Sequence, residues 1–113
     1  MKTITIQNAA RMCPATGIEI IILGNTKKSM LVYITAQPGA VVPSHSHPHD
    51  QIGTCVQGGG ELLSGGKKHK TLPSTAWTIP GDEVHEWKNT SDGVTILIEC
   101  FAPPREDYLA KAK

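Results

Sequence analysis

Two histidine-bearing segments do most to constrain how this chain can fold: His45-x-His47-x3-Gln51 and, after a later turn, His85. In an extended strand alternate side chains point to the same side, so His45 and His47 are expected to project together. Gln51 opens the next strand, and His85 comes from a distant hairpin. Imidazole nitrogens and an amide oxygen suit a borderline divalent ion such as Zn, Ni, Fe(II) or Mn. The spacing predicts one divalent metal site assembled from two separate β-hairpins.

Turn signals and composition favour a fold made of short strands. Pro48, Gly58–Gly60 and the pair Pro80 and Gly81 mark turns around the histidine segments. With 39% hydrophobic residues, eleven glycines, eight prolines and only short apolar runs, the composition argues against long helices. A length of 113 residues predicts a single domain over 1–113. We expect an all-β barrel or jelly roll.

The apolar periodicity predicts strands near 3–7, 18–23, 30–36, 41–47, 51–57, 60–64, 68–72, 76–79, 84–88 and 94–101. Residues 3–7 alternate like an edge strand and lack the apolar stretch of a signal peptide, and no segment reaches transmembrane length. Residues 105–113 are expected to form a short helix, with acids in its first turn and lysines in its last. Because a small barrel has exposed edge strands that a partner could cover, we expect a homodimer.

The net charge bears on the class of partner, and the cysteine content bears on the cellular location. Eleven basic and ten acidic residues give a net charge of +1, which offers no reason to propose nucleic acid or a membrane as partner. The basic segment Lys67–Lys70 is expected to be a solvated hairpin turn, with His69 on the surface. Three cysteines, an odd number, predict reduced thiols and a cytoplasmic location. We assign Cys13 and Cys100 to packing, and Cys55 to packing inside the barrel.

The two histidine segments resemble the motifs of the cupin superfamily, G-x5-H-x-H-x3,4-E-x6-G and G-x5-P-x-G-x2-H-x3-N. The matching positions are Gly39, His45, His47, Gly58, Pro80, His85 and Asn89. Three positions depart from the pattern: Gln51 replaces glutamate, Ser74 replaces glycine, and Gly81 lies one place early. The resemblance implies a double-stranded β-helix, a jelly-roll-like barrel, with motifs at 39–58 and 74–89. It also implies that His45, His47, Gln51 and His85 are the metal ligands.

Two residues close to this set have other interpretations. Pro48 interrupts the alternation before His49, and a fifth protein ligand would close positions that a substrate needs, so His49 is expected at the rim. Trp87 shares parity with His85 and could form a wall of the pocket, although an aromatic residue in a barrel more often belongs to the core.

The amide of Gln51 changes the chemistry expected of the site. A carboxylate there would neutralise half the charge of a divalent ion, whereas an amide leaves the full charge to attract anions and polarise oxygen atoms. Oxygen chemistry at iron usually relies on a carboxylate ligand. We therefore expect redox-neutral chemistry on a negatively charged, hydroxyl-bearing substrate.

The carboxy-terminal strand supplies further candidates. Leu97, Glu99 and Phe101 alternate on one side, so Glu99 would sit among apolar neighbours, where an acid needs a partner or a function. Arg105 follows a Pro-Pro corner that could turn it over the barrel mouth, where it could clamp a carboxylate. The alternatives are a solvent-facing or lysine-paired Glu99 and a solvated Arg105 at a helix start.

This tail and the His45-x-His47-x3-Gln51 segment together look like the KdgF-type cupins of pectin and alginate breakdown. Those proteins convert 4,5-unsaturated uronate monosaccharides to linear ketonised forms. The resemblance implies that Phe101 binds the sugar face, Arg105 binds the substrate carboxylate, and Glu99 moves the proton. The family has aspartate at the position of Glu99, so the side chain here is one methylene longer.

The sequence therefore predicts a metal-dependent isomerase or lyase acting on carboxylated sugars. Two alternatives remain: a metal-dependent dioxygenase of a small organic substrate, which Gln51 argues against, and a non-catalytic cupin that binds a sugar or another small ligand.

Overall fold

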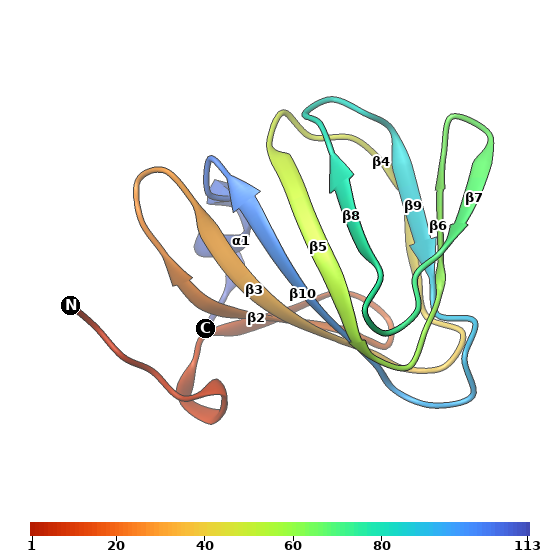
Figure 1. Cartoon of the computed structure of the whole chain (residues 1–113). Coiled ribbons are helices and arrows are strands. Elements are labelled where there is room, and N and C mark those ends of the chain that lie inside the picture. The colour runs from red at the N-terminus through yellow and green to blue at the C-terminus, as the bar shows by residue number, and fades with distance from the viewer.

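The alternating strands fold into two antiparallel sheets that face each other across a shared core (Figure 1). The computed structural model describes residues 1–113. The six-stranded sheet has the order β1 (Arg11–Ala15), β2 (Ile18–Asn25), β3 (Met30–Ala36), β10 (Thr95–Ala102), β5 (Asp50–Gln57) and β8 (Ala76–Ile79). The four-stranded sheet has the order β4 (Val41–His45), β9 (His85–Lys88), β6 (Glu61–Ser64) and β7 (Lys67–Lys70). A 3-10 helix, η1 (Ile6–Asn8), precedes the sheets, and α1 (Glu106–Lys111) follows them. The predicted all-β fold with a short carboxy-terminal helix is confirmed.

Period-two alternation explains which side chains enter the core. On β3, Val32, Ile34 and Ala36 are buried while the residues between them are more exposed, and β10 follows the same rule. Burial of one such aliphatic side chain contributes about 1.5–3 kcal/mol, so the alternation fixes the face that each strand turns inward.

The register of β10 aligns the residues that matter for the site. Glu99 lies opposite Gly53 of β5, and Gly53 lies opposite Trp77 of β8. One row further along, Phe101 lies opposite Gln51. Two adjacent inward rows of the six-stranded sheet therefore bring an acid, an amide and two aromatic rings together.

Two expectations about the amino-terminal region are wrong. Residues 3–7 do not form a strand: residues 3–5 have no regular structure, residues 6 and 7 belong to η1, and all five are exposed. The edge strand is instead β1, which the periodicity missed because its pairing with β2 is irregular between Met12 and Ala15. That irregularity leaves Cys13 exposed, so its assignment to packing is also wrong.

Other expectations about the cysteines and the basic segment fare differently. Cys55 is buried in the core as predicted, Cys100 is partly buried, and all three cysteines are free. Lys67–Lys70 is exposed as expected, but it forms an edge strand, so its prediction as a turn is wrong; the hairpin turn precedes it at Gly65 and Gly66. None of the helices has the length and apolar character needed to cross a membrane.

Candidate functional site

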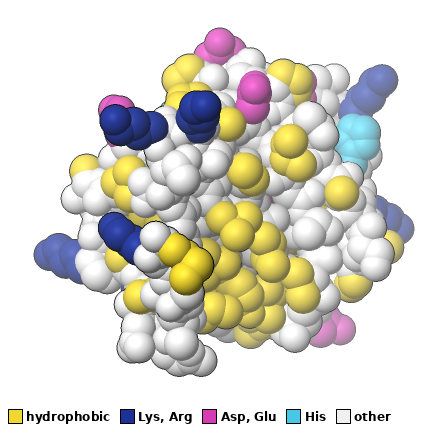
Figure 2. Space-filling model, turned by 60° about the vertical axis from the view of Figure 1, so that its left-hand side comes forward, with side chains coloured by type: hydrophobic (Ala, Val, Ile, Leu, Met, Phe, Trp, Pro, Cys, Tyr) yellow, Lys and Arg dark blue, Asp and Glu magenta, His cyan; other side chains and the backbone are white.

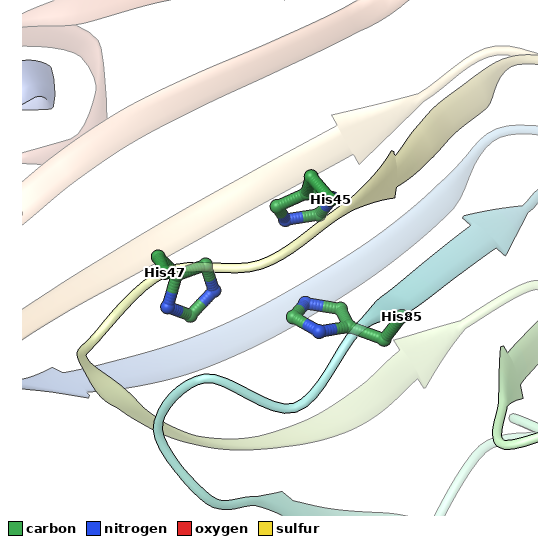
Figure 3. A group of neighbouring side chains, drawn as sticks. All are labelled: His45, His47 and His85. Atoms are coloured by element: carbon green, nitrogen blue, oxygen red, sulfur yellow. The ribbon is translucent and has the colours of Figure 1, made fainter.

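Three histidine rings converge between the sheets (Figure 3). His45 ends β4 and His85 begins β9, and these two residues lie opposite each other in the register. Their ring centroids are 4.4 Å apart, and that of His47 lies 5.5 Å from the first and 5.2 Å from the second. One ring nitrogen from each lies within 4.8 Å of the others, so the cluster could hold a metal ion.

His47 was predicted to lie on the same strand as His45, but it does not. Because β9 begins at His85, β4 has no partner beyond His45 and ends there. His47 therefore lies in the irregular segment between β4 and β5 and not on a strand. Its ring still points inward, and only 8% of His47 is exposed.

Backbone carbonyls orient all three rings. The Nδ1 atoms of His45, His47 and His85 lie 2.7, 3.1 and 2.8 Å from the carbonyl oxygens of Pro43, His49 and Glu83. A carbonyl only accepts hydrogen bonds, so each Nδ1 carries the proton and each Nε2 keeps a free lone pair. Histidines that bind metals are commonly held this way.

The free lone pairs test whether a metal fits. His85 Nε2 is buried and has no hydrogen-bond partner. His47 Nε2 lies 3.0 Å from Gln51 Oε1, and with the proton on Nδ1 both atoms are acceptors. A cation coordinated by both atoms would relieve the repulsion between their lone pairs. The donor set of three neutral nitrogens and an amide oxygen therefore fits a borderline divalent ion.

Two of the histidines are held neutral by their surroundings. Burial, reinforced by the positive charge of Arg105, lowers the pKa of His47 to about 4, although the contact with Gln51 acts in the opposite direction. Burial likewise lowers the pKa of His85. Neutral imidazole is the form that binds a metal, so these two ligands do not have to lose a proton near neutral pH.

Glu99 is a buried acid held by two donors. Its Oε2 accepts hydrogen bonds from Gln51 Nε2 and, at 3.2 Å, from Trp77 Nε1. Burial raises the pKa of Glu99, and both hydrogen bonds act against that rise. Gly53 makes the arrangement possible, because a Cβ there would lie 2.6 Å from Trp77 Nε1 and 2.9 Å from Glu99 Oε2. Glu99 is 6% exposed and therefore does not face solvent.

Arg105 is also buried and has one unused nitrogen. Its Nε and Nη2 donate to the two carboxylate oxygens of Asp107 at 3.0 and 2.9 Å. The guanidinium carbon lies 4.1 Å from the ring centroid of Tyr108 and 5.0 Å from that of Phe101. Nη1 is buried without a partner. A guanidinium so held leaves one donor for an anion.

These groups line a single cavity of about 220 Å³. Its lining includes His45, His85, Gln51, Glu99, Phe101, Arg105, Trp77, Trp87, Asp107 and Tyr108. The structure thus brings together the residues predicted for the site. Both interpretations of Trp87 hold, because its side chain lines the cavity and also belongs to the hydrophobic core. His49 is half-buried beside His47, outside this cavity but within a separate surface groove.

Three contributors were not predicted: Trp77, Asp107 and Tyr108. Trp77 shares parity with Ile79 on β8, which was the only available signal. Asp107 lies two residues after Arg105, a separation that carries no pattern before the chain direction after Pro104 is known. Tyr108 had no signal, because it acts through its packing on Arg105 and Phe101.

Comparison with known proteins places this geometry in context. Residues 32–101 match the family model described as a cupin domain. The chain is 30% identical over 94 residues to the pectin degradation protein KdgF of Dickeya dadantii (strain 3937), across 82% of this chain and 84% of that protein. The structure of KdgF from Halomonas sp. has a TM-score of 0.86 at 29% identity, and the match covers 95% of this chain and 97% of that chain. An RmlC-like cupin from Shewanella frigidimarina has a TM-score of 0.85 at 23% identity over 95% of both chains, which shows similarity of fold.

Proposed function

The chain belongs to the cupin family, and on that basis we propose that it is a metal-dependent enzyme that converts 4,5-unsaturated uronate monosaccharides to their linear keto forms. One observation carries the proposal: the metal donors His45, Gln51 and His85, a buried acid and a buried arginine with a free nitrogen line one small cavity, and His47 completes the histidine cluster beside it. Similarity to a pectin degradation protein supports the choice of substrate class.

The size of the cavity supports a monosaccharide. At about 220 Å³ it lies slightly below the roughly 300–1,000 Å³ of typical ligand pockets. A single sugar ring suits that space better than a polymer does. Trp77, Phe101 and Trp87 provide apolar walls that a sugar face can contact.

The substrate carboxylate would bind Arg105. Nη1 is the free donor, while Asp107 occupies Nε and Nη2 and the rings of Tyr108 and Phe101 fix the guanidinium plane. An anion in this position would supply the hydrogen-bond partner that the buried Nη1 lacks. Arg105 therefore fixes the end of the sugar at which the reaction occurs.

The acid–base role would fall to Glu99. A divalent ion held by His45, His47, Gln51 and His85 would act as a Lewis acid that polarises a substrate oxygen. Glu99 would carry a proton from a substrate oxygen to the carbon of the former double bond, so ring opening and ketonisation neither gain nor lose an atom. Trp77 and Gln51 keep the carboxyl group directed at the cavity.

The test uses unsaturated galacturonate or mannuronate released by a polysaccharide lyase. The metal-loaded protein is expected to accelerate loss of the ultraviolet absorbance of the conjugated double bond above the spontaneous rate, with no uptake of oxygen. The Glu99→Gln variant should lose on the order of 100-fold in turnover while keeping its metal content, because general acid–base catalysis is worth about that much. Glu61→Gln is the matched control, since Glu61 lies on β6 outside the cavity. A rate equal to background, or oxygen consumption in step with substrate, contradicts the proposal.

The free cysteines bear on where the enzyme works. All three thiols are unpaired, and Cys13 is exposed. Exposed free thiols persist in reducing compartments, which supports our proposal of a cytoplasmic enzyme.

A further inference from the structure

We propose that Lys111 is a specificity-determining residue, whose ammonium group selects anionic sugars over neutral sugars where the cavity opens to solvent. The inference rests on the proposed function for its substrate class, a sugar carboxylate. It assigns part of that selectivity to a residue outside the metal donors, Glu99 and Arg105. Binding and turnover both test it, so the two proposals can fail separately.

The helix α1 turns three side chains toward the cavity. Asp107, Tyr108 and Lys111 line it, whereas the other three residues of the helix are exposed to solvent outside it. Residues at positions i, i+1 and i+4 lie on one face of a helix, so the helical period explains this set. A rise of about 1.5 Å per residue places Lys111 about 6 Å further along the helix axis than Asp107.

Lys111 lies where the cavity meets solvent. It is exposed and yet belongs to the lining, as does the exposed Pro14 of β1. The deeper part of the lining is buried and includes Glu99, Phe101 and Arg105. An anion that enters past Lys111 therefore moves from an exposed cation toward a buried one.

The backbone of Lys111 is held in place by the residues that follow it. Ala112 packs against the hydrophobic core, and its N–H donates to the carbonyl oxygen of Tyr108. Lys113 exchanges two backbone hydrogen bonds of 3.1 Å with Arg11, the first residue of β1. These contacts fix the end of the helix beside the cavity, so the side chain of Lys111 stays at its entrance.

Lys111 has no carboxylate partner. The chain forms two ion pairs, Arg11 with Glu19 and Arg105 with Asp107. Asp107 is the acid one helical turn before Lys111, but both of its carboxylate oxygens accept hydrogen bonds from Arg105. The ammonium group of Lys111 is therefore available to an incoming anion.

The other charges of the chain do not replace the field of Lys111 at the entrance. Arg105 lies 2.9 Å from Asp107, so an anion at a distance meets a nearly neutral pair. The net charge of the chain is only +1. On the face drawn in Figure 2, basic side chains lie around the rim of a broad hydrophobic area and form no large patch. A cation at the entrance therefore supplies attraction that the rest of the surface lacks.

The kinetic test replaces Lys111 by Gln, which removes the charge and keeps most of the length. We expect kcat/KM for the unsaturated uronate to fall about fivefold at low ionic strength while kcat changes less than about twofold, because the charge acts on capture and not on the reacting atoms. The loss should largely vanish in about 0.5 M salt, where the Debye length is only about 4 Å. Lys111→Arg keeps the charge and should restore the value. Lys113→Gln is the matched control, since it removes the same charge two residues later, outside the lining.

Binding of saturated galacturonate and of neutral galactose to the metal-loaded protein, measured by calorimetry, gives a result that is independent of turnover. Lys111→Gln should weaken galacturonate binding about fivefold and leave galactose unchanged. That outcome without turnover would contradict the reaction proposed above and support the role of Lys111. The role of Lys111 is overturned if the unmodified chain does not bind galacturonate, if the variant weakens neither sugar or both equally, or if Lys113→Gln has the same effect.

Discussion

Arg105 has its orientation set by Asp107, a residue outside the metal-donor set. Asp107 accepts two hydrogen bonds from the guanidinium, and this interaction lowers the pKa of the Asp107 carboxyl. The side chain of Asp107 is itself 48% exposed, whereas that of Arg105 is 9% exposed. A partly exposed carboxylate therefore fixes a buried cation.

Replacement of Asp107 by Asn tests that role. The amide keeps the size but loses the charge and one acceptor, so Arg105 should present Nη1 less reliably to a carboxylate. We expect KM for the uronate to rise about tenfold while kcat changes by roughly twofold or less, because the reacting groups are untouched. Steady-state kinetics at low and high salt provide the measurement, with a smaller effect at high salt because Asp107 is exposed to screening. Glu106→Gln is the control, and an equal change in KM for both variants would contradict the positioning role.

Tyr108 provides a prediction about pH. Burial raises the pKa of its phenol to about 12 from an ordinary value near 10, despite the opposing charge of Arg105. The folded state therefore holds its proton more tightly than the unfolded state between these values. The contribution of Tyr108 to the free energy of unfolding is fully present below pH 10 and is lost as the pH rises toward 12, by up to about 2 kcal/mol.

Urea unfolding at pH 8, 10 and 11 measures this effect. The Tyr108→Phe variant should lose less stability over that range than the unmodified chain, because phenylalanine has no proton to release. Tyr33→Phe is the control for general alkaline effects, since Tyr33 lies on the outward face of β3, away from the cavity that Tyr108 lines. Parallel losses in the unmodified chain and in Tyr108→Phe would refute the assignment.

The predictability of the site differs from residue to residue. His45 and Gln51 could be grouped from sequence because spacing and strand parity are local, and His85 joined them because a second motif with cupin spacing surrounds it. Asp107, Trp77 and Tyr108 could not, because each acts through a side chain that only the tertiary fold brings near. Glu99 and Arg105 were left with solvent-exposed alternatives, and burial was needed to exclude them.

Among the connections between strands, the loop from β7 to β8 contains a residue, Ser74, that differs from the cupin motif and has a strained backbone conformation. Ser74 occupies a position where the cupin motif has glycine, and its φ is +73°. A side chain in this left-handed region costs about 1 kcal/mol, which glycine avoids. The loop is held by backbone hydrogen bonds between Ser74 N and Cys55 O and between Cys55 N and Thr75 O.

Ser74→Gly should therefore stabilise the fold by about 0.5–1 kcal/mol, since relief of strain exceeds the added entropy of the unfolded chain. Ser44→Gly is the matched control: Ser44 lies on β4 without a positive φ, and glycine in a strand should destabilise by a similar amount. Chemical denaturation of the two variants gives opposite signs if the backbone argument holds. A destabilising Ser74→Gly would show that the serine side chain makes a compensating contact.

Strand prediction succeeded where a strand has a regular partner. β2, β3, β5 and β10 lie within about two residues of their predicted bounds, because each pairs with a strand on both sides and carries a run of apolar residues. The failures lie where pairing is irregular or missing. β1 contains Pro14 within a register shift, and residues 3–7 have a strand pattern without a strand beside them.

Across the complete fold, the metal donors connect the two sheets. His45 and His85 belong to the four-stranded sheet, whereas Gln51 belongs to the six-stranded sheet. An ion held by these residues would join the sheets at the open end of the core. It would also neutralise the repulsion between His47 Nε2 and Gln51 Oε1, two acceptors that lie 3.0 Å apart when the proton of His47 is on Nδ1.

Removal of the metal should therefore lower stability and not only activity. Because an ion that binds only the folded state stabilises it by mass action, a concentration of 1,000 times Kd adds about 4 kcal/mol. We expect the unfolding midpoint to drop on chelation and to recover when Zn, Ni, Fe(II) or Mn is restored, and the ion that gives the largest recovery identifies the preferred metal. His85→Ala should melt at the same temperature with and without the ion, since it loses a ligand whose Nε2 has no other partner. His69→Ala should respond as the unmodified chain does, because His69 lies exposed on β7. If chelated and metal-loaded protein unfold at one temperature, the two sheets are not joined through these donors, and the assignment of His45, His47, Gln51 and His85 as metal ligands fails with it.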